Sequence, residues 1–140
     1  RNDALALFDT IYKKHAKVML IGRSLGSGLA IAVAAQRSAS CLIMITPYDS
    51  ILEIAASQFR FFPVKWLLLD KYESWRYAPD IKIPTLLIMA EFDEIIPAAN
   101  TKKLHDAFAP GIAGLQIIPG TSHNSVSSSP KYLELIQSML

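Results

Sequence analysis

The heptapeptide GRSLGSG, at residues 22–28, lies between two apolar stretches of different character. The stretch before it, residues 18–21, is short and apolar, which is typical of a buried strand. The stretch after it, residues 29–35, is rich in alanine, which favours a helix. The glycines between them allow a strand and a helix to approach each other closely. The sequence therefore predicts a strand that turns sharply into a helix at Ser24.

The first five residues of this heptapeptide follow the pattern G-x-S-x-G. In that pattern a strained turn lifts the serine hydroxyl clear of the sheet, where it can act as a nucleophile. The same turn directs the N–H of Leu25 and the N-terminus of the helix toward a developing oxyanion. We therefore predict that Ser24 is a catalytic nucleophile and that Leu25 contributes a donor to an oxyanion hole.

A glycine-rich turn of this kind can also be purely structural, or it can hold a phosphate group. A Walker-type phosphate loop has Lys and then Ser or Thr after its last glycine, whereas Leu29 follows Gly28 here. The dinucleotide-binding spacing G-x-G-x-x-G is not met either. The structural turn stays open as an alternative at this point, and the rest of the chain has to decide. A nucleophile of this type is followed by an acid and then by a histidine.

Carboxylates follow the apolar run at residues 84–90, which is predicted to be a buried strand. Catalytic groups gather at the carboxyl ends of the strands in parallel sheets. We therefore assign the acid that orients a histidine to Asp93. Glu91 and Glu94 are close alternatives by position, and Asp49, after an earlier strand, is a more distant one.

The chain has 3 histidines, and their positions relative to the predicted strands distinguish them. His123 follows the apolar run 115–118 through a loop of small residues, from which its imidazole can reach Ser24. We predict that His123 is the general base. His15 is interpreted as a structural or solvated residue that closes an N-terminal helix, and His105 as part of the helix 98–108.

These assignments predict a hydrolysis in two steps. Ser24 attacks a carbonyl carbon while His123 accepts its proton, and water then hydrolyses the acyl-enzyme. Asp93 holds the imidazole in the correct tautomer. The predicted substrate is a small ester or amide, or one with an acyl chain, and the chemistry needs no cofactor and no metal ion.

The order of elements predicts an α/β fold, a parallel sheet with helices on both faces. Predicted strands at 17–21, 41–46, 85–90 and 114–118 alternate with predicted helices at 3–15, 26–37, 98–108 and 130–140. A helical insert follows Ser50 and extends to residue 77, and we treat residues 50–80 as a short cap-like segment. It contains several aromatic residues, Phe59, Phe61, Phe62, Trp66 and Trp75. Packing of a short helix onto the sheet is the favoured interpretation of these side chains, and the wall of an acyl pocket is the alternative.

Only a helix precedes the strand at 17–21, so the strands that would flank it are expected to be absent. We therefore expect residues 1–140 to form a single partial domain that lacks its N-terminal strands and the loop carrying a second oxyanion donor. Strand 17–21 would then be an exposed apolar edge, and such edges pair with other strands. Two readings follow: an active hydrolase, or an incomplete one that acts as a folding or association module and forms a homo-oligomer.

Five segments in the same order resemble the second half of an alpha/beta hydrolase, and in particular the bud-emergence-suppressor-like group of small-capped serine hydrolases. They are GRSLGSG at 22–28, TPYDSI at 46–51, KIPTLLI at 82–88, DEIIP at 93–97 and PGTSHN at 119–124. The resemblance implies Ser24 as nucleophile, Asp93 as acid and His123 as base. The chain departs from the group at residues 90–91, where Ala-Glu stands in place of the frequent His-Gly.

Composition excludes other classes of function. The chain is 51% hydrophobic, which strands buried on both faces explain, and no apolar stretch approaches the roughly 20 residues of a membrane span. The formal net charge is +2 with no basic stripe, so nucleic acid is not an expected partner. Cys41, the single cysteine, opens a predicted strand and is interpreted as a core residue. A lone cysteine mildly favours a cytoplasmic location.

Overall fold

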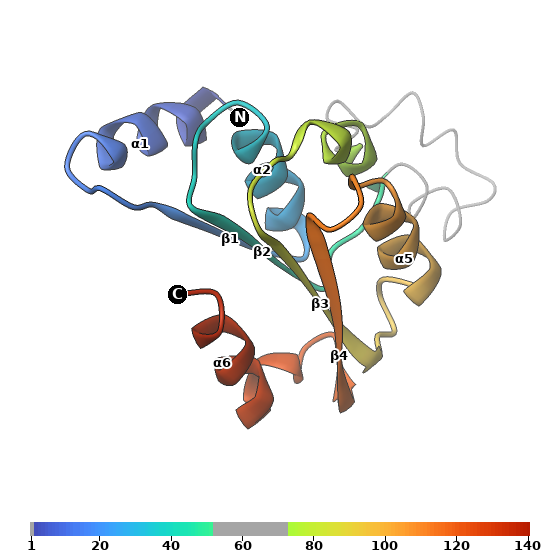
Figure 1. Ribbon diagram of the computed structural model, residues 1–140. Helices are drawn as coiled ribbons and strands as arrows, with labels where there is room; N and C mark the ends of the chain where they lie inside the picture. The colour runs from blue at the N-terminus through green and yellow to red at the C-terminus, as the bar shows by residue number, and fades with distance from the viewer. Residues whose placement is uncertain (1, 52–72) are drawn as a thin grey trace.

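The computed structural model describes residues 2–51 and 73–140 (Figure 1). In this part of the chain one parallel sheet has the order β1-β2-β3-β4. Its strands are β1 (Met19–Arg23), β2 (Cys41–Ile45), β3 (Thr85–Phe92) and β4 (Ala113–Ser122). The helices are α1 (Asn2–Tyr12), α2 (Leu25–Ala34), η1 (Ser74–Arg76), η2 (Ala78–Asp80), α5 (Ala98–Asp106), η3 (Val126–Ser128) and α6 (Pro130–Gln137), of which those labelled η are 3₁₀ helices. The predicted α/β class is confirmed.

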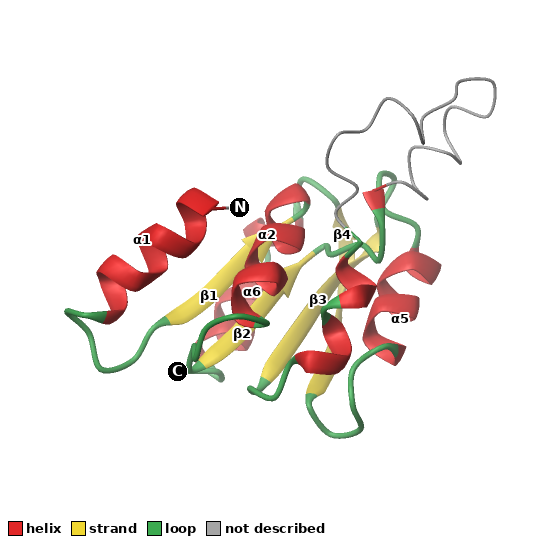
Figure 2. Cartoon of the chain, turned by 90° about the horizontal axis from the view of Figure 1, so that it is seen from above, coloured by secondary structure: helices red, strands yellow, loops and turns green. Residues whose placement is uncertain are grey.

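Helices cover both faces of the sheet (Figures 1 and 2). Leu42 and Met44 of β2 pack in a core with residues of α2 and α5. Ile43 and Ile45 of the same strand pack with residues of α6 on the opposite face, because successive side chains of a strand point to opposite sides. α1 lies beside α2 and contributes Phe8 to a smaller core. None of the described helices is both long and apolar enough to cross a membrane.

The interior strand β2 is buried along its whole length. An uninterrupted apolar run is what a parallel strand covered on both faces requires, and the sequence of β2 is CLIMI. Cys41 is buried in this strand, as predicted, and burial raises the pKa of its thiol. The thiol is therefore protonated at neutral pH and acts as a small apolar side chain.

The carboxyl ends of the strands form the edge on which the candidate site is built. Arg23 of β1 pairs with Ile45 of β2, and Ile45 pairs with Ile88 of β3. β3 and β4 continue beyond this level, with a register shift between Ala90 and Phe92. The loops that follow β3 and β4 therefore begin beyond the end of β1, where Ser24 lies.

Several element boundaries differ from the predicted ones. β4 does not end before Pro119 but continues to Ser122. Proline lacks a backbone donor and is tolerated in edge strands, and β4 has only β3 as a neighbour in the described sheet. α1 ends at Tyr12 rather than at residue 15, and α2 ends at Ala34 rather than at residue 37.

The insert predicted at 50–80 is described only at its ends. Residues 52–72, which include Phe59, Phe61, Phe62 and Trp66, lie outside the described residues. The part after them forms the two short 3₁₀ helices η1 and η2. Trp75 is 39% exposed, and the Arg76 guanidinium carbon lies over its ring at 5.2 Å from the centroid. Trp75 is therefore a surface residue stacked on a neighbouring side chain.

β1 is an edge strand of the described sheet, as predicted. Its side chain Ile21 is 49% exposed. A groove of about 370 Å³ runs along the strand and is lined mainly by apolar side chains of α1, β1 and α2, including Leu7 and Leu29. One edge of this sheet is thus apolar and unpaired within the described residues.

Candidate active site

Ser24 occupies the turn between β1 and α2 in a strained backbone conformation. Its φ is 49° and its ψ is −121°, a region that side-chain-bearing residues rarely adopt and that costs on the order of 1–3 kcal/mol. The surrounding main chain holds this conformation. Ser24 N–H donates to the carbonyl of Ile45 at 2.8 Å, and the Ser27 hydroxyl donates to the carbonyl of Ser24 at 2.6 Å.

The two glycines that flank this turn have different roles. A Cβ built on Gly22 would lie 2.6 Å from the carbonyl oxygen of Gly26 and 2.7 Å from the Cβ of Ala30. Only glycine therefore allows β1 to approach α2 at this point. A Cβ on Gly26 would have no atom within 4 Å. The expectation that both flanking glycines permit close packing is thus correct for Gly22 and wrong for Gly26.

The structure brings three predicted side chains together at the carboxyl edge of the sheet. His123 Nε2 lies 3.0 Å from Ser24 Oγ. His123 Nδ1 lies 3.0 Å from each carboxylate oxygen of Asp93. The His123 side chain is 6% exposed and the Asp93 side chain is 7% exposed. A hydroxyl, an imidazole and a carboxylate thus form one continuous and nearly buried hydrogen-bonded chain.

The loop after β3 fixes the orientation of the Asp93 carboxylate. Its Oδ1 accepts the N–H of Ile95 at 3.0 Å and the N–H of Ile96 at 2.8 Å, in addition to contacting the imidazole. An ionised carboxylate has about four acceptor positions, so it can make all of these bonds at once. The carboxylate is therefore oriented by the main chain before any substrate binds.

The alternative acids make different contacts. Glu94 Oε2 accepts the main-chain N–H of His123 at 3.2 Å, and Glu91 Oε2 accepts the N–H of Gly120 at 2.7 Å. Both carboxylates therefore hold the main chain of the histidine loop rather than the imidazole. The Asp49 side chain is fully buried, binds the Asn100 amide at 2.7 Å and pairs with Lys103 at 3.0 Å. The geometry favours Asp93 among these candidates.

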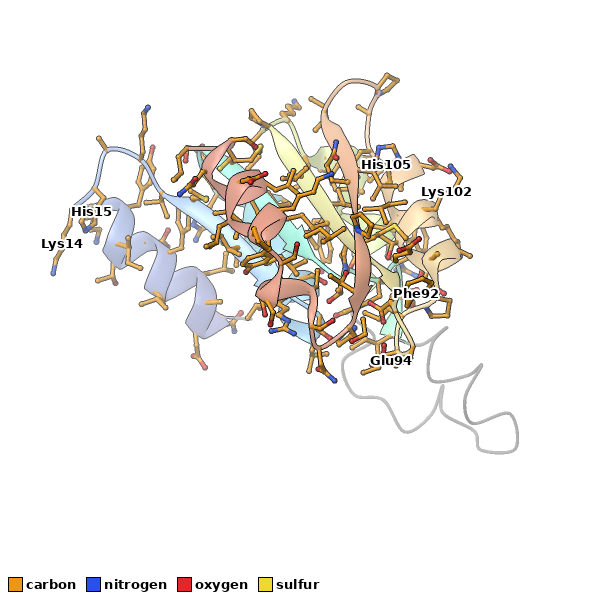
Figure 3. All side chains as sticks on the ribbon, turned by 90° about the horizontal axis from the view of Figure 1, so that it is seen from below. Lys14, His15, Phe92, Glu94, Lys102 and His105 are labelled. Carbon is orange, nitrogen blue, oxygen red and sulfur yellow. The ribbon has the colours of Figure 1, made fainter. Side chains whose placement is uncertain are left out.

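The other two histidines lie away from this cluster. His105 is on α5, where its Nε2 is 3.1 Å from the carbonyl oxygen of Ala113 and its Nδ1 is 3.3 Å from Asp106. His15 follows α1 and is far from Glu94, which lies in the loop after β3 (Figure 3). His15 lies three residues beyond the end of α1, but its N–H donates to the carbonyl of Ile11 at 3.1 Å and its side chain is exposed.

Leu25 is the first residue of α2. The first N–H groups of a helix have no acceptor within that helix, so Leu25 N–H is oriented away from it. The Tyr48 hydroxyl donates to the carbonyl of Leu25 at 3.2 Å, which attaches the start of α2 to the segment after β2. The side chain of Leu25 is 58% exposed.

Sequence reasoning missed the contacts made by Arg23, Glu91 and Glu94. Arg23 Nη2 donates to the carbonyl of His123 at 3.0 Å and lies 3.4 Å from that of Asn124. These are contacts between a side chain and a distant main chain, for which a single sequence carries no periodic signal. Within residues 2–51 and 73–140, no group of three or more His, Cys, Asp or Glu side chains could hold a metal ion.

A sequence model of the serine hydrolase (FSH1) family matches residues 3–123, which include all three members of the cluster. The chain belongs to the FSH1 serine hydrolase family. The resemblance to alpha/beta hydrolases is thereby confirmed at the level of the superfamily.

Curated relatives of this FSH1-family chain include hydrolases. A Mycobacterium tuberculosis protein described as uncharacterized is 32% identical over 109 residues, covering 78% of this chain and 38% of the relative. The Xenopus tropicalis lysophosphatidylserine lipase ABHD12 is 29% identical, covering 99% of this chain and 43% of the lipase. The Caenorhabditis elegans alpha/beta hydrolase domain-containing protein aho-3 is 27% identical, covering 89% and 36%. The FSH1-family chain thus spans less than half the length of these relatives.

Solved structures share the fold at low identity. An acetyl xylan esterase from Paenibacillus sp. R4 superposes with a TM-score of 0.78 at 17% identity, covering 97% of this chain and 49% of that one. A monoacylglycerol lipase from Paleococcus ferrophilus superposes with a TM-score of 0.69 at 16% identity, covering 99% and 74%. The FSH1-family chain therefore has an alpha/beta hydrolase fold over its described residues.

Proposed function

We propose that this chain catalyses hydrolysis of ester or amide bonds through an acyl-enzyme, with Ser24 as nucleophile, His123 as base and Asp93 as orienting acid. The observation that supports this most strongly is the hydrogen-bonded chain from Ser24 through His123 to Asp93, with three contacts of 3.0 Å. These residues come from three separate strand ends, and they meet in a protein of a serine hydrolase family.

The proposed mechanism follows from the two nitrogens of one imidazole. With its proton on Nδ1, facing Asp93, His123 presents a lone pair on Nε2 to the hydroxyl of Ser24. Attack of Oγ on the substrate carbonyl transfers the hydroxyl proton to Nε2, and Asp93 stabilises the resulting imidazolium. The imidazolium then protonates the leaving group. In the second step His123 deprotonates a water molecule, which attacks the acyl-enzyme, and the imidazolium returns the proton to Ser24 as the acid is released.

The proposed oxyanion site lies at the start of α2. The N–H of Leu25 follows the nucleophile directly, as an oxyanion donor in this type of turn does. The positive end of the helix adds to its effect on a developing negative charge. Removal of one such donor typically costs about 3 kcal/mol in transition-state stabilisation.

We further propose an ester with an acyl chain as the substrate class. Apolar side chains are exposed close to the reacting residues in sequence: Leu25 beside Ser24, and Phe92 and Ile95 beside Asp93, with exposures of 58%, 65% and 41%. The names of relatives and structural neighbours, a lysophosphatidylserine lipase, a monoacylglycerol lipase and an acetyl xylan esterase, support acyl esters as substrates.

The test is reaction with a fluorophosphonate, followed by intact mass spectrometry of the wild type and of Ser24→Ala. The proposal expects one adduct per chain in the wild type and none in the variant. A series of p-nitrophenyl esters of increasing acyl length then defines the substrate preference. An adduct that persists in Ser24→Ala would overturn the assignment of the nucleophile.

Within residues 2–51 and 73–140, β1 has no partner strand on its outer side, and this edge favours self-association as a second candidate function. Two copies could pair their β1 strands antiparallel about a twofold axis, covering the exposed Ile21 of each. Sedimentation velocity of the 1–140 chain tests this. A dimer that Ile21→Glu converts to a monomer is expected, and a wild-type monomer at all concentrations would exclude the association.

A further inference from the structure

Arg23 is the residue between Gly22 and the candidate nucleophile, and its side chain reaches the histidine loop. Its Nη2 donates to the carbonyl of His123 at 3.0 Å and lies 3.4 Å from the carbonyl of Asn124. A guanidinium NH₂ group carries two protons, so it can serve two acceptors. The turn that carries Ser24 is therefore joined to the main chain of His123 as well as to its imidazole.

The loop that carries Asp93 binds the other side of His123. The N–H of His123 donates to Glu94 Oε2 at 3.2 Å, while Asp93 contacts the imidazole. Each of the two segments that contact the His123 ring thus also binds the His123 main chain. The Arg23 guanidinium binds the His123 carbonyl, and the Glu94 carboxylate binds the His123 N–H.

This arrangement matters because His123 lies at the end of an edge strand. His123 directly follows β4, an edge strand of the described sheet, and Gly120 near the end of that strand has a φ of 68°. The imidazole has to align with Ser24 and Asp93 at once, so a displaced main chain would break one of the two contacts. A misplacement of about 1 Å at such a centre typically lowers the rate by about 10²-fold.

We propose that Arg23 is a positioning residue, which holds the main chain of His123 so that Nε2 stays within hydrogen-bond reach of Ser24 Oγ. The inference rests on the proposed function of Ser24 and His123. A guanidinium suits this task because its charge strengthens hydrogen bonds to carbonyl oxygens and its geometry is planar and fixed. Lysine supplies the charge on a flexible stem without the fixed planar group, so Arg23→Lys should restore only part of the effect.

The competing explanation is that Arg23 binds an anionic group of the substrate. The two roles predict different kinetic parameters. A positioning residue acts on the chemical step and lowers kcat for all substrates alike, whereas a substrate-binding cation acts on KM for anionic substrates only. Two esters that differ by one carboxylate on the acyl chain therefore separate them.

The experiment uses the complete natural polypeptide and three variants, Arg23→Met, Arg23→Lys and Arg37→Met. Arg37 is the matched control, since it also forms hydrogen bonds from a surface guanidinium, but to Asp9 between α1 and α2. We expect Arg23→Met to lower kcat by about 10²-fold on both esters with KM changed less than twofold. The rate of fluorophosphonate labelling should fall by the same factor. Arg37→Met should leave both rates within about twofold of wild type, and thermal denaturation verifies that each variant is folded.

Each other outcome overturns the inference. A rise in KM for the anionic ester alone, an equal loss of activity in Arg37→Met, or an unchanged kcat in Arg23→Met would each show that Arg23 does not position His123. These outcomes all presuppose a wild type that is labelled at Ser24. A wild type that is not labelled would instead refute the proposed function, so the two failures are distinguishable.

Discussion

The carboxylate of Glu94 accepts the main-chain N–H of His123 at 3.2 Å, one residue after the carboxylate that contacts the ring of the same histidine. Neighbouring acids thus bind one residue at two different groups. In Glu94→Gln the amide oxygen can still accept this hydrogen bond, whereas in Glu94→Ala it is lost. We predict near wild-type kcat for Glu94→Gln and a loss of about tenfold for Glu94→Ala, measured with p-nitrophenyl acetate.

The same measurement in the double variant Arg23→Met/Glu94→Ala tests whether the two side chains act through one residue. Side chains that support a common group have non-additive effects. The loss in the double variant should be smaller than the product of the two single losses. A loss equal to that product would mean that the two side chains act independently.

The two buried or partly buried histidines offer a paired test of the base. Replacement of His123 with alanine removes the acceptor of the Ser24 proton, and we predict a loss of kcat of about 10⁴ to 10⁶-fold. His105→Ala removes a ring of α5 that contacts Ala113 and Asp106, and kcat should be unchanged. Hydrolysis of one ester by both variants is the measurement. Comparable losses would mean that the base is misassigned.

The glycines of the turn predict opposite effects on stability. Gly22→Ala places a Cβ 2.6 Å from a backbone oxygen, so it should destabilise the fold by at least about 1–3 kcal/mol. Gly26→Ala meets no atom within 4 Å and lies inside α2, so it should stabilise by about 0.4–1 kcal/mol through a less flexible unfolded chain. Urea denaturation of both variants gives the free energies of unfolding. Equal destabilisation by both would contradict the packing at Gly22.

An ion pair between a buried carboxylate and a half-exposed ammonium group joins the segment after β2 to α5. The Asp49 carboxylate is fully buried and lies 3.0 Å from the ammonium group of Lys103. Lys103→Met leaves the buried carboxylate with its hydrogen bond from Asn100 but without this cation, and it should destabilise by about 1–3 kcal/mol. The control is Lys102→Met, which removes an exposed pair with Asp106 at 3.9 Å and should cost less than about 0.5 kcal/mol. Equal unfolding free energies for the two variants would exclude a stabilising role for the Asp49 contact.

Stability should also depend on pH through α1. Hydrogen bonds from Arg37 hold the pKa of Asp9 below its ordinary value of 3.8. A carboxylate with a lowered pKa stabilises the fold above its unfolded pKa, and this contribution is lost as the pH falls through the folded pKa. The unfolding free energies of wild type and Asp9→Asn should therefore differ at pH 6 and converge well below pH 3.8. If the difference in unfolding free energy between the two proteins grew as the pH fell, Asp9 would not have a lowered pKa in the folded protein.

Much of the fold could be predicted because buried parallel strands leave a strong local signal. The sequence CLIMI of β2 is apolar throughout and lies between helical segments. The boundaries of the elements were harder to predict, because they depend on the neighbouring elements in the fold. Pro119 argues against a strand when read locally, but it is acceptable at the edge of a sheet, and edge positions follow only from the strand order.

The candidate site also has parts that could be predicted from the sequence and parts that could not. Ser24, Asp93 and His123 could be singled out because each follows a recognisable strand and because their order along the chain is informative. The sequence favoured Asp93 but left Glu91 and Glu94 as close alternatives, since all three acids lie within four residues at a strand end, and the contacts of the three carboxylates distinguish them. Arg23 carried no signal at all, because its acceptor is a carbonyl 100 residues away.

The order of strands places β2 and β3 between the strand that leads to Ser24 and the strand that leads to His123. With neighbouring strands about 4.8 Å apart, β1 and β4 are separated by roughly 14 Å, yet the side chains of the residues that directly follow them meet at hydrogen-bond distance. The proposed reacting centre therefore depends on the whole sheet. No single strand and helix removed from it would retain the chemistry, and fraying at either outer strand should extinguish activity before the protein as a whole unfolds.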